Sequence, residues 1–205
     1  MSMMDTTPLG VGRARWGRGW RTVGAAVGAA VGALACGGVL VALAACQASP
    51  PAPPLPTVAS VDLARYAGAW YEVAMLPNRF QSQCVADTQA RYRPTGDDIE
   101  VVNRCRQADG TLSEATGIAK PVAGSGNAKL RVSFFRPFYG DYWILALADD
   151  YRWVLVGEPD RKFGWVLSRT PSLPAADLEA ALGRAQALRY EREAFKLTPQ
   201  TQPLP

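Results

Sequence analysis

Residues 129–156 read KLRVSFFRPFYGDYWILALADDYRWVLV, three alternating apolar runs separated by two short breaks. The runs are Lys129–Phe135, Asp141–Ala148 and Arg152–Val156, and the breaks contain Pro, Gly and Asp. Alternation with a period of two indicates β-strands, and short breaks of turn-forming residues join such strands in antiparallel order. This part of the chain therefore predicts a meander.

The same pattern continues on both sides of these three runs. Five more strands are predicted: Gly68–Met75, Val85–Arg93, Ile99–Arg106, Thr111–Lys120 and Phe163–Arg169. Turn residues such as Ala108-Asp109-Gly110 separate them. Eight short strands at even spacing predict an up-and-down barrel or a β-sandwich.

One helix follows the strands. Pro174 suits the first turn of a helix. Leu178, Ala181, Leu182 and Ala185 then recur at helical spacing, so they are expected to pack on the outside of the sheet.

The chain begins with the three parts of a secretory signal. Four arginines lie between Arg13 and Arg21, an uncharged run extends from Thr22 to Cys46, and the run ends in Leu43-Ala44-Ala45-Cys46. This ending resembles the lipobox of lipoproteins. Residues 1–45 are therefore predicted to be a signal peptide, and Cys46 the acylated first residue, carrying chains such as palmitate.

Two alternatives to this signal stay open. The run from Val23 to Ala45 is long enough for an uncleaved transmembrane helix. Cys36 is a second candidate for acylation, although Ala33 replaces the branched residue that the lipobox prefers. Gln47 after the cysteine resembles Gram-negative lipoproteins of the outer membrane, so a periplasm-facing outer-membrane location is expected.

Removal of the signal changes the charge of the protein. Residues 1–45 carry four Arg and one Asp, which is +3 of the formal net charge of +4. The remaining chain is nearly neutral, which argues against nucleic acid as a partner. We expect a Pro-rich tether over residues 46–60, a barrel domain over 61–199 and a loose tail over 200–205.

Three short motifs carry a resemblance to a known family. Residues 68–70 read GAW at the start of the first strand, residues 149–151 read DDY between the sixth and seventh, and Arg169 ends the eighth. In this order they resemble the G-x-W, T-D-Y and arginine motifs of lipocalins, with Asp149 in place of Thr. Residues 134–140, FFRPFYG, resemble the bacterial outer-membrane subgroup. The resemblance covers about residues 61–200 and implies an eight-stranded antiparallel up-and-down barrel.

Strand order gives a separate reason for these motif residues to meet. In a meander, the start of strand one, the turn after strand six and the end of strand eight share one end of the barrel. A structural plug of Gly68, Trp70, Asp150, Tyr151 and Arg169 is therefore expected. Arg169 would stack on the indole of Trp70 in a cation–π contact.

Strand alternation also predicts the lining of the barrel, which has room for one small ligand. The candidate ligand contacts are Tyr92, Val132, Phe134, Tyr142, Ile144, Trp153, Leu155 and Trp165, with Phe80 at the open end. The same alternation puts Ala146 inside, and Leu147, Val154 and Val156 outside under the helix. For each of these residues, core filling is at least as strong an alternative as ligand contact. Phe80 and Phe138 either contact lipid or a partner, or fold back over the rim.

Cys84 and Cys105 lie on facing strands of one predicted hairpin. In an exported protein this arrangement favours a disulfide between them. Two free thiols, or one redox-active cysteine, stay open as alternatives.

Enzyme chemistry has little support in this sequence. It contains no His, which removes His-dependent catalysis and His-ligated metals. It has no glycine-rich nucleotide loop, so we expect no catalytic residue, cofactor or metal. The resemblance to lipocalins implies storage or transport of a fatty acid or lysophospholipid by a membrane-anchored protein, as a monomer or a homodimer. The alternatives are a filled barrel that binds another envelope protein, and a lipid-modifying lipocalin enzyme that uses a reduced Cys84.

Overall fold

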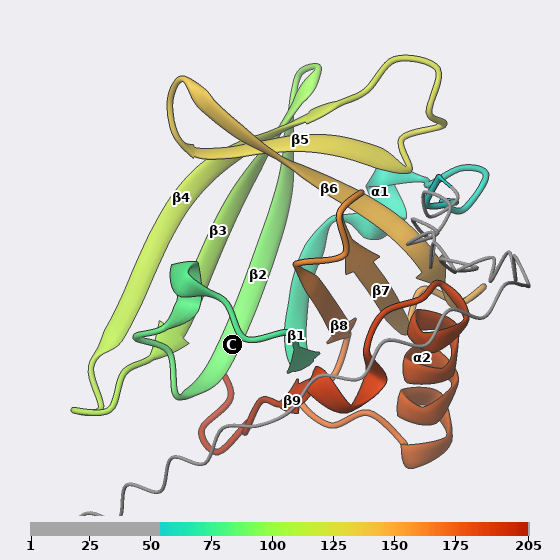
Figure 1. Cartoon of the computed structure of the whole chain (residues 1–205). Helices are drawn as coiled ribbons and strands as arrows, with labels where there is room; N and C mark the ends of the chain where they lie inside the picture. Colours follow the sequence, from blue (N-terminus) through green and yellow to red (C-terminus); the bar gives the residue numbers. More distant parts are fainter. Residues whose placement is uncertain (1–53, 205) are drawn as a thin grey trace, which may run out of the picture. The chain divides into compact units, whose positions relative to one another are not determined.

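The computed structural model describes residues 54–204, which form a closed eight-stranded antiparallel barrel (Figure 1). The strands are β1 (Gly68–Met75), β2 (Ala86–Thr95), β3 (Asp98–Arg106), β4 (Leu112–Pro121), β5 (Lys129–Phe135), β6 (Phe138–Leu147), β7 (Trp153–Gly157) and β8 (Gly164–Ser168). The other elements are α1 (Leu63–Tyr66), η1 (Arg79–Gln81), α2 (Ala175–Ala187), η2 (Arg192–Ala194) and β9 (Lys196–Leu197).

The predicted barrel with one helix outside is confirmed. The predicted signal and Cys46 lie outside the described residues. Within residues 54–204, no helix has the length and apolar character needed to cross a bilayer.

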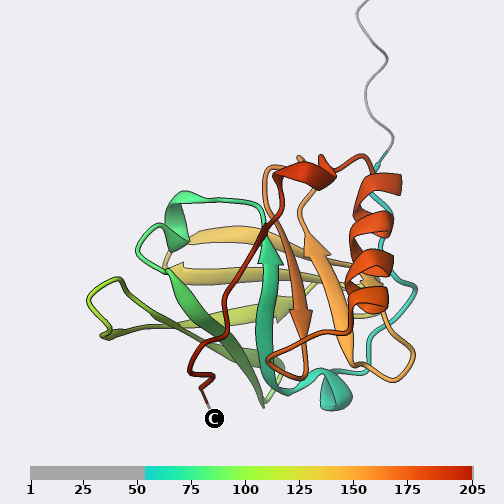
Figure 2. The same ribbon diagram turned by 90° about the horizontal axis from the view of Figure 1, so that it is seen from below.

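Each strand pairs with its neighbours in sequence, and β1 pairs with both β8 and β2, which closes the barrel. We call the end that carries α1 and the start of β1 the closed end. The mouth is the opposite end, formed by residues 76–85, 107–111, 136–137 and 158–163. η1 and the β3–β4 and β5–β6 turns, all at the mouth, lie on the left in both Figure 1 and Figure 2.

Two apolar clusters fill the protein, one on each face of the sheet. The inner cluster lies inside the barrel and includes Trp70, Ile99, Leu130, Ile144 and Leu167. The outer cluster lies between the sheet and α2, and includes Val73, Leu145, Val166, Ala181, Leu182 and Ala185. Burial of these three helix residues confirms the apolar face predicted for α2.

The predicted faces of β7 are wrong. Trp153 and Leu155 pack in the outer cluster, whereas Val154 and Val156 lie in the inner cluster. The prediction extended the alternation of β7 from Tyr151, but Tyr151 has φ +64° and precedes the strand, so the alternation does not pass through it.

The end of β6 is reversed as well. Ala146 packs in the outer cluster and Leu147 against the inner one, opposite to the prediction. The register of β6 against β7 shifts between Ile144 and Ala146. An extra residue of this kind turns all later side chains to the other face.

β1 and β2 pair over only part of their length. Their ladder covers Gly68–Tyr71 and Gln89–Tyr92, and beyond it the strands part toward the mouth. We call this opening the seam. Residues 196–204, the strap, close it: β9 pairs with Ala74 and Met75, and the rest continues between the two strands (Figure 2).

The two ends of the described segment are attached to the barrel, contrary to prediction. In the expected tether, Leu55 is buried in the outer cluster and the Val58 amide donates to the Ile144 carbonyl at 3.0 Å. In the expected loose tail, Leu204 is buried and its carbonyl accepts hydrogen bonds from Tyr71 and Gln89. The ordered domain therefore extends over both predicted boundaries.

Candidate functional site

The closed end of the barrel is sealed by Arg169 and Trp70. The Arg169 guanidinium lies 3.8 Å from the centre of the Trp70 indole. It also donates to the carbonyl oxygens of Ala67 and Ala69, both at 2.9 Å, and to that of Arg65. Trp70 is fully buried, and its Nε1 donates to the Tyr66 carbonyl at 2.8 Å. No ligand can reach the barrel interior through these packed groups.

Tyr151 and Asp150 play different parts at this end. The Tyr151 hydroxyl accepts from the Asp62 amide at 3.0 Å, and the Arg65 guanidinium lies 3.9 Å from the Tyr151 ring centre, so Tyr151 holds α1 in place. Asp150 instead pairs with Arg152 at 2.9 Å on the surface, and Arg152 also pairs with Asp177 of α2. Of the predicted plug, the structure therefore joins Trp70 and Arg169 directly. Gly68, with φ +95°, lies next to the Arg169 guanidinium.

Three tyrosine hydroxyls form a chain inside the barrel. Tyr142 Oη lies 2.7 Å from Tyr66 Oη and 2.9 Å from Tyr92 Oη. Burial raises the pKa of Tyr92 to about 12 and raises the pKa values of Tyr66 and Tyr142 well above their ordinary value, so all three stay protonated. Two hydrogen bonds use two of the three protons, which leaves one hydroxyl proton for another acceptor.

The inner face of β3, β4 and β5 is partly accessible to solvent. The register pairs Asn103 with Ala90 and Ala115, and Val101 with Gly117, so these residues share the inner face. Ala115 is exposed although it is on that face, and Phe134, which packs over Gly117, is 44% exposed. Small side chains here leave the inner wall open to solvent from the mouth.

Asn103 places an unpaired polar group on this wall. Its Oδ1 is buried and accepts no hydrogen bond from any residue that the structure describes. A buried acceptor without a partner is costly, and the cost disappears when a donor arrives. A ligand with a hydroxyl or amide donor would therefore pair with Asn103 after a rotation of the side chain that exposes Oδ1.

A second opening lies at the seam. It is a cavity of about 200 Å³ between β1, residues 77–88 and the strap. Glu72 is buried at this cavity and accepts hydrogen bonds from Gln81 Nε2 at 2.7 Å and Thr198 Oγ1 at 2.5 Å. Burial raises the pKa of Glu72, and the two hydrogen bonds oppose this rise only in part.

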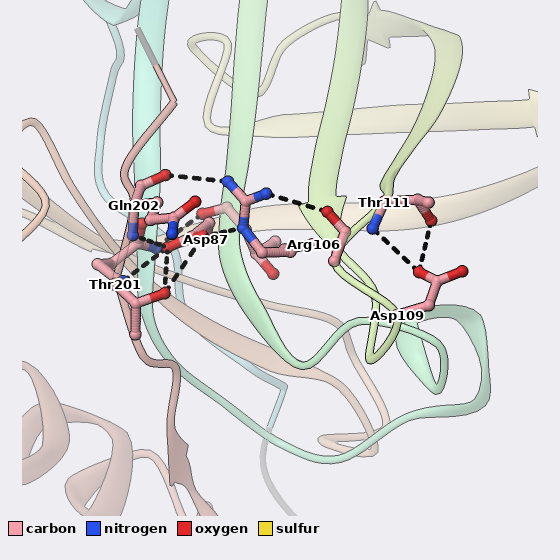
Figure 3. Close-up of polar contacts among 9 residues, drawn as sticks. Asp87, Arg106, Asp109, Thr111, Thr201 and Gln202 are labelled. Carbon is pink, nitrogen blue, oxygen red and sulfur yellow. Dashed lines mark hydrogen bonds and ion pairs between the residues drawn. The ribbon is translucent and has the colours of Figure 1, made fainter.

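Next to this cavity, Asp87 joins β2 to the strap across the seam. Its buried carboxylate accepts from Arg106 Nε at 2.6 Å and from the amides of Thr201 at 2.6 Å and Gln202 at 2.9 Å (Figure 3). Burial alone would raise the pKa of Asp87, but these donors outweigh it and lower the pKa below its ordinary value. Gln200 adds a bridge, since its Nε2 donates to the carbonyls of Glu72 and Thr88 on the two parted strands.

The comparisons with known proteins agree with this geometry. The model of the lipocalin-like domain matches residues 61–200. The chain belongs to the lipocalin family. It is 34% identical to temperature-induced lipocalin-1 of Arabidopsis thaliana over 153 residues, which is 70% of this chain and 82% of that protein. It is 36% identical to the outer membrane lipoprotein Blc of Escherichia coli K12 over 130 residues, which is 63% of this chain and 73% of that protein. This similarity supports the bacterial subgroup that the FFRPFYG motif indicates.

Solved structures show the same fold at lower identity. Insecticyanin from Manduca sexta superposes with a TM-score of 0.61 at 22% identity, covering 73% of this chain and 86% of that one. At this level of identity the likeness supports the lipocalin barrel alone.

The predicted ligand contacts of this lipocalin fall into three groups. Inside the barrel lie Tyr92, Val132, Tyr142, Ile144 and Trp165, and Phe134 lies on the inner wall near the mouth. Trp153 and Leu155 face α2 and cannot contact a ligand in the barrel. Phe80 lies on the rim, 60% exposed, with its ring 5.5 Å from that of Phe163. Ligand contact by the residues on the inner face and at the rim stays a prediction.

Several polar residues of the lipocalin interior and seam were not predicted. Glu72 is two residues after the inward Trp70, so alternation could have placed it inside. Asn103 shares a face with Val101 and could have been found in the same way. No comparable signal marks Asp87 or Gln200, because their partners are far away in the sequence.

The disulfide between Cys84 and Cys105 is present, with Cα atoms 5.5 Å apart. It attaches residues 76–85 of the mouth to β3. Replacing both cysteines with Ala is expected to lower the free energy of unfolding by about 3 kcal/mol, because the bond closes a loop over a separation of 21 residues. Urea unfolding of Cys84→Ala/Cys105→Ala against the parent measures this loss. Equal midpoints, or two titratable thiols in the unreduced denatured protein besides any acylated cysteine, would contradict it.

Proposed function

We propose that this lipocalin binds a single-chain lipid, a fatty acid or a lysophospholipid, inside its barrel and stores or transports it in the bacterial envelope. The observation that carries the proposal is the accessible inner wall at Asn103, Ala115 and Gly117, where small side chains leave Ala115 exposed. The packed groups at Trp70 and Arg169 seal the opposite end. A concave, mostly apolar surface with few polar groups suits an apolar ligand.

The polar groups inside the barrel suit the head of such a lipid. Asn103 offers an unpaired acceptor near the mouth, and the tyrosine chain offers one proton deeper in the barrel. A lipid hydroxyl, such as that of the glycerol group of a lysophospholipid, would donate to Asn103 Oδ1, while the acyl chain lies along Val101 and Val132.

The relatives and the sequence both support the proposed location. The relatives named outer membrane lipoprotein Blc support an outer-membrane location for this chain, and Cys46 is the residue proposed to carry the acyl anchor. The anchor would hold the barrel on the periplasmic side, next to membrane lipid. Monomer and homodimer are both compatible with this function.

A binding role is favoured over the two alternatives. The enzyme alternative depends on a free thiol at Cys84, which is joined to Cys105. The filled-barrel alternative depends on a solid interior, whereas Ala115 and Phe134 are accessible on the inner wall.

Blocking the inner wall tests the proposal. Ala115→Trp is expected to raise the Kd for a fluorescent fatty acid by about tenfold or more, since a bulky ring would occupy the ligand space. Thr116→Trp is the matched control, because Thr116 is exposed on the opposite face of the same strand. Its Kd is expected to stay within about twofold of the parent. Unchanged affinity in Ala115→Trp, or no lipid binding by the parent, would reject a barrel site.

A further inference from the structure

Exposed apolar side chains gather at the mouth of the barrel. Phe135 is 75% exposed and Phe138 70% exposed at the β5–β6 turn, and Phe80 is exposed on η1. Val85 in the β1–β2 connection and Leu112 at the start of β4 add two exposed apolar side chains. At the closed end, the only large apolar side chain exposed within residues 54–204 is Val122. The apolar surface is therefore concentrated at one end of the barrel.

These aromatic rings contact each other without becoming buried. Phe135 and Phe138 stack with their planes 7° apart and their centres 6.2 Å apart. On another part of the rim, the Phe80 ring is tilted by 52° against that of Phe163, with ring centres 5.5 Å apart. Apolar groups that stay exposed together on projecting loops are typical of surfaces that contact lipid or a partner.

Two arginines stand beside these rings. Arg79 precedes Phe80, with its guanidinium 5.1 Å from the ring centre, and Arg136 lies between Phe135 and Phe138 in the turn. Neither arginine forms an ion pair with any residue in the described part of the chain. Arg and Phe together are suited to the lipid interface, where the ring enters the acyl region and the cation meets the phosphate groups.

The acidic residues of the mouth are used within their own turns. Asp109 accepts hydrogen bonds from the amide and hydroxyl of Thr111. Glu158 accepts from the amides of Asp160 and Lys162, and Asp160 pairs with Lys162 at 3.6 Å. These hydrogen bonds leave the two carboxylates charged, but none of the three acids forms an ion pair with Arg79 or Arg136. The charges adjacent in sequence to Phe80, Phe135 and Phe138 are therefore the two arginines, which favour an anionic surface.

We propose that the mouth docks on an anionic phospholipid surface, with Phe80, Phe135 and Phe138 inserted among the lipids and Arg79 and Arg136 on their phosphates. The apolar groups project from separate connections around an opening, and a fluid lipid surface fits such a rim better than a rigid protein face. Docking would let a lipid pass between bilayer and barrel without crossing water. This surface goes beyond the proposed cargo site and does not depend on it.

Hydrogen exchange of the anchored full chain in vesicles tests the proposal. One vesicle contains only phosphatidylcholine, and the other contains phosphatidylglycerol in addition. In the anionic vesicles, exchange at residues 79–82 and 135–139 is expected to slow by about tenfold. Exchange at residues 122–127 of the closed end is expected to be the same in both vesicles. The closed end serves as an internal control, since the membrane anchor is identical in the two samples.

Matched charge variants identify the surface that docks. Arg79→Gln/Arg136→Gln is expected to abolish the slowing, whereas Arg184→Gln/Arg189→Gln, which removes two exposed arginines on α2 and just after it, should keep it. Slowing that is equal in both vesicles, or that rises with protein concentration, would overturn the proposal in favour of a protein partner or a second copy. Loss of lipid uptake with normal slowing would contradict the cargo site alone. Normal uptake without slowing would contradict docking alone.

Discussion

Trp70→Ala is expected to lower the free energy of unfolding by about 4 kcal/mol, the loss typical of a buried Trp in a packed core. Trp70 is fully buried, packs against Tyr66 with ring centres 5.0 Å apart and planes tilted by 35°, and lies under the Arg169 guanidinium. Its removal would leave a cavity at the closed end and an arginine without its aromatic surface. Urea unfolding followed by far-UV circular dichroism measures the change.

Arg169→Leu tests the other half of the plug. We expect a loss of about 3 kcal/mol, since three backbone carbonyls lose a charged donor. Arg93→Leu is the matched control, because Arg93 makes one exposed ion pair with Glu100 and should cost less than about 1 kcal/mol. The losses at Trp70 and Arg169 should not be additive in the double variant. Additive losses, or a loss below that of Arg93→Leu, would show that the two residues do not act together.

Asp87→Ala is expected to lower the free energy of unfolding by about 3 kcal/mol and to release residues 200–204 from the seam. The buried carboxylate binds Arg106 and two amides of the strap, and all three donors would lose their acceptor. Asp87→Asn is expected to cost less, because Asn tolerates the positive φ of 56° at this position and keeps one acceptor oxygen. Proteolysis at the strap, alongside urea unfolding, separates release of the strap from global unfolding. A strap that stays protected in Asp87→Ala would contradict this role.

The contribution of Asp87 to the free energy of unfolding falls as the pH is lowered. The pKa of its carboxyl is lowered in the folded protein from the ordinary value of 3.8. The stabilisation is therefore complete above that value and is lost as the pH falls through the lower folded pKa. The difference in stability between the parent and Asp87→Asn should shrink over the same range below 3.8. A difference that persists under strong acid would rule out the carboxylate charge as its source.

The sequence predicted the strands and the contact of Trp70 with Arg169, and the resemblance to lipocalins favoured the barrel over a sandwich. Eight alternating runs determined the strand order, and the order of a meander placed Trp70 and Arg169 at one end without any knowledge of distances. The pairing of Cys84 with Cys105 followed from the same hairpin. The alternation of apolar residues and the order of the strands determine these features, and the sequence shows both.

Features that depend on one inserted residue could not be predicted. Trp153 and Leu155 have the same apolar character as Val154 and Val156, so composition does not distinguish the two faces of β7. The register shift after Ile144 and the positive φ of Tyr151 decide which pair faces inward. The sequence around Ile144 and Tyr151 marks neither feature, because the adjacent residues are apolar on both faces of the sheet.

The strap and the tether were misjudged for a different reason. Pro and Gln in residues 199–203 are typical of loose segments when considered locally. Their order comes from acceptors and donors 112 to 128 residues away, such as the carbonyls of Glu72 and Thr88. Leu55 is ordered by burial in the outer cluster, a contact that a Pro-rich composition does not reveal.

The strap also determines how this barrel can fold. β1 and β2 are neighbours in sequence, yet their parted halves are joined only by residues that follow them by more than 100 positions. A folding chain must keep both strand edges unpaired until this distant segment arrives, and such long-range closure is slow, on a scale of milliseconds to seconds. During that interval the seam is the edge most open to pairing with a strand from another chain.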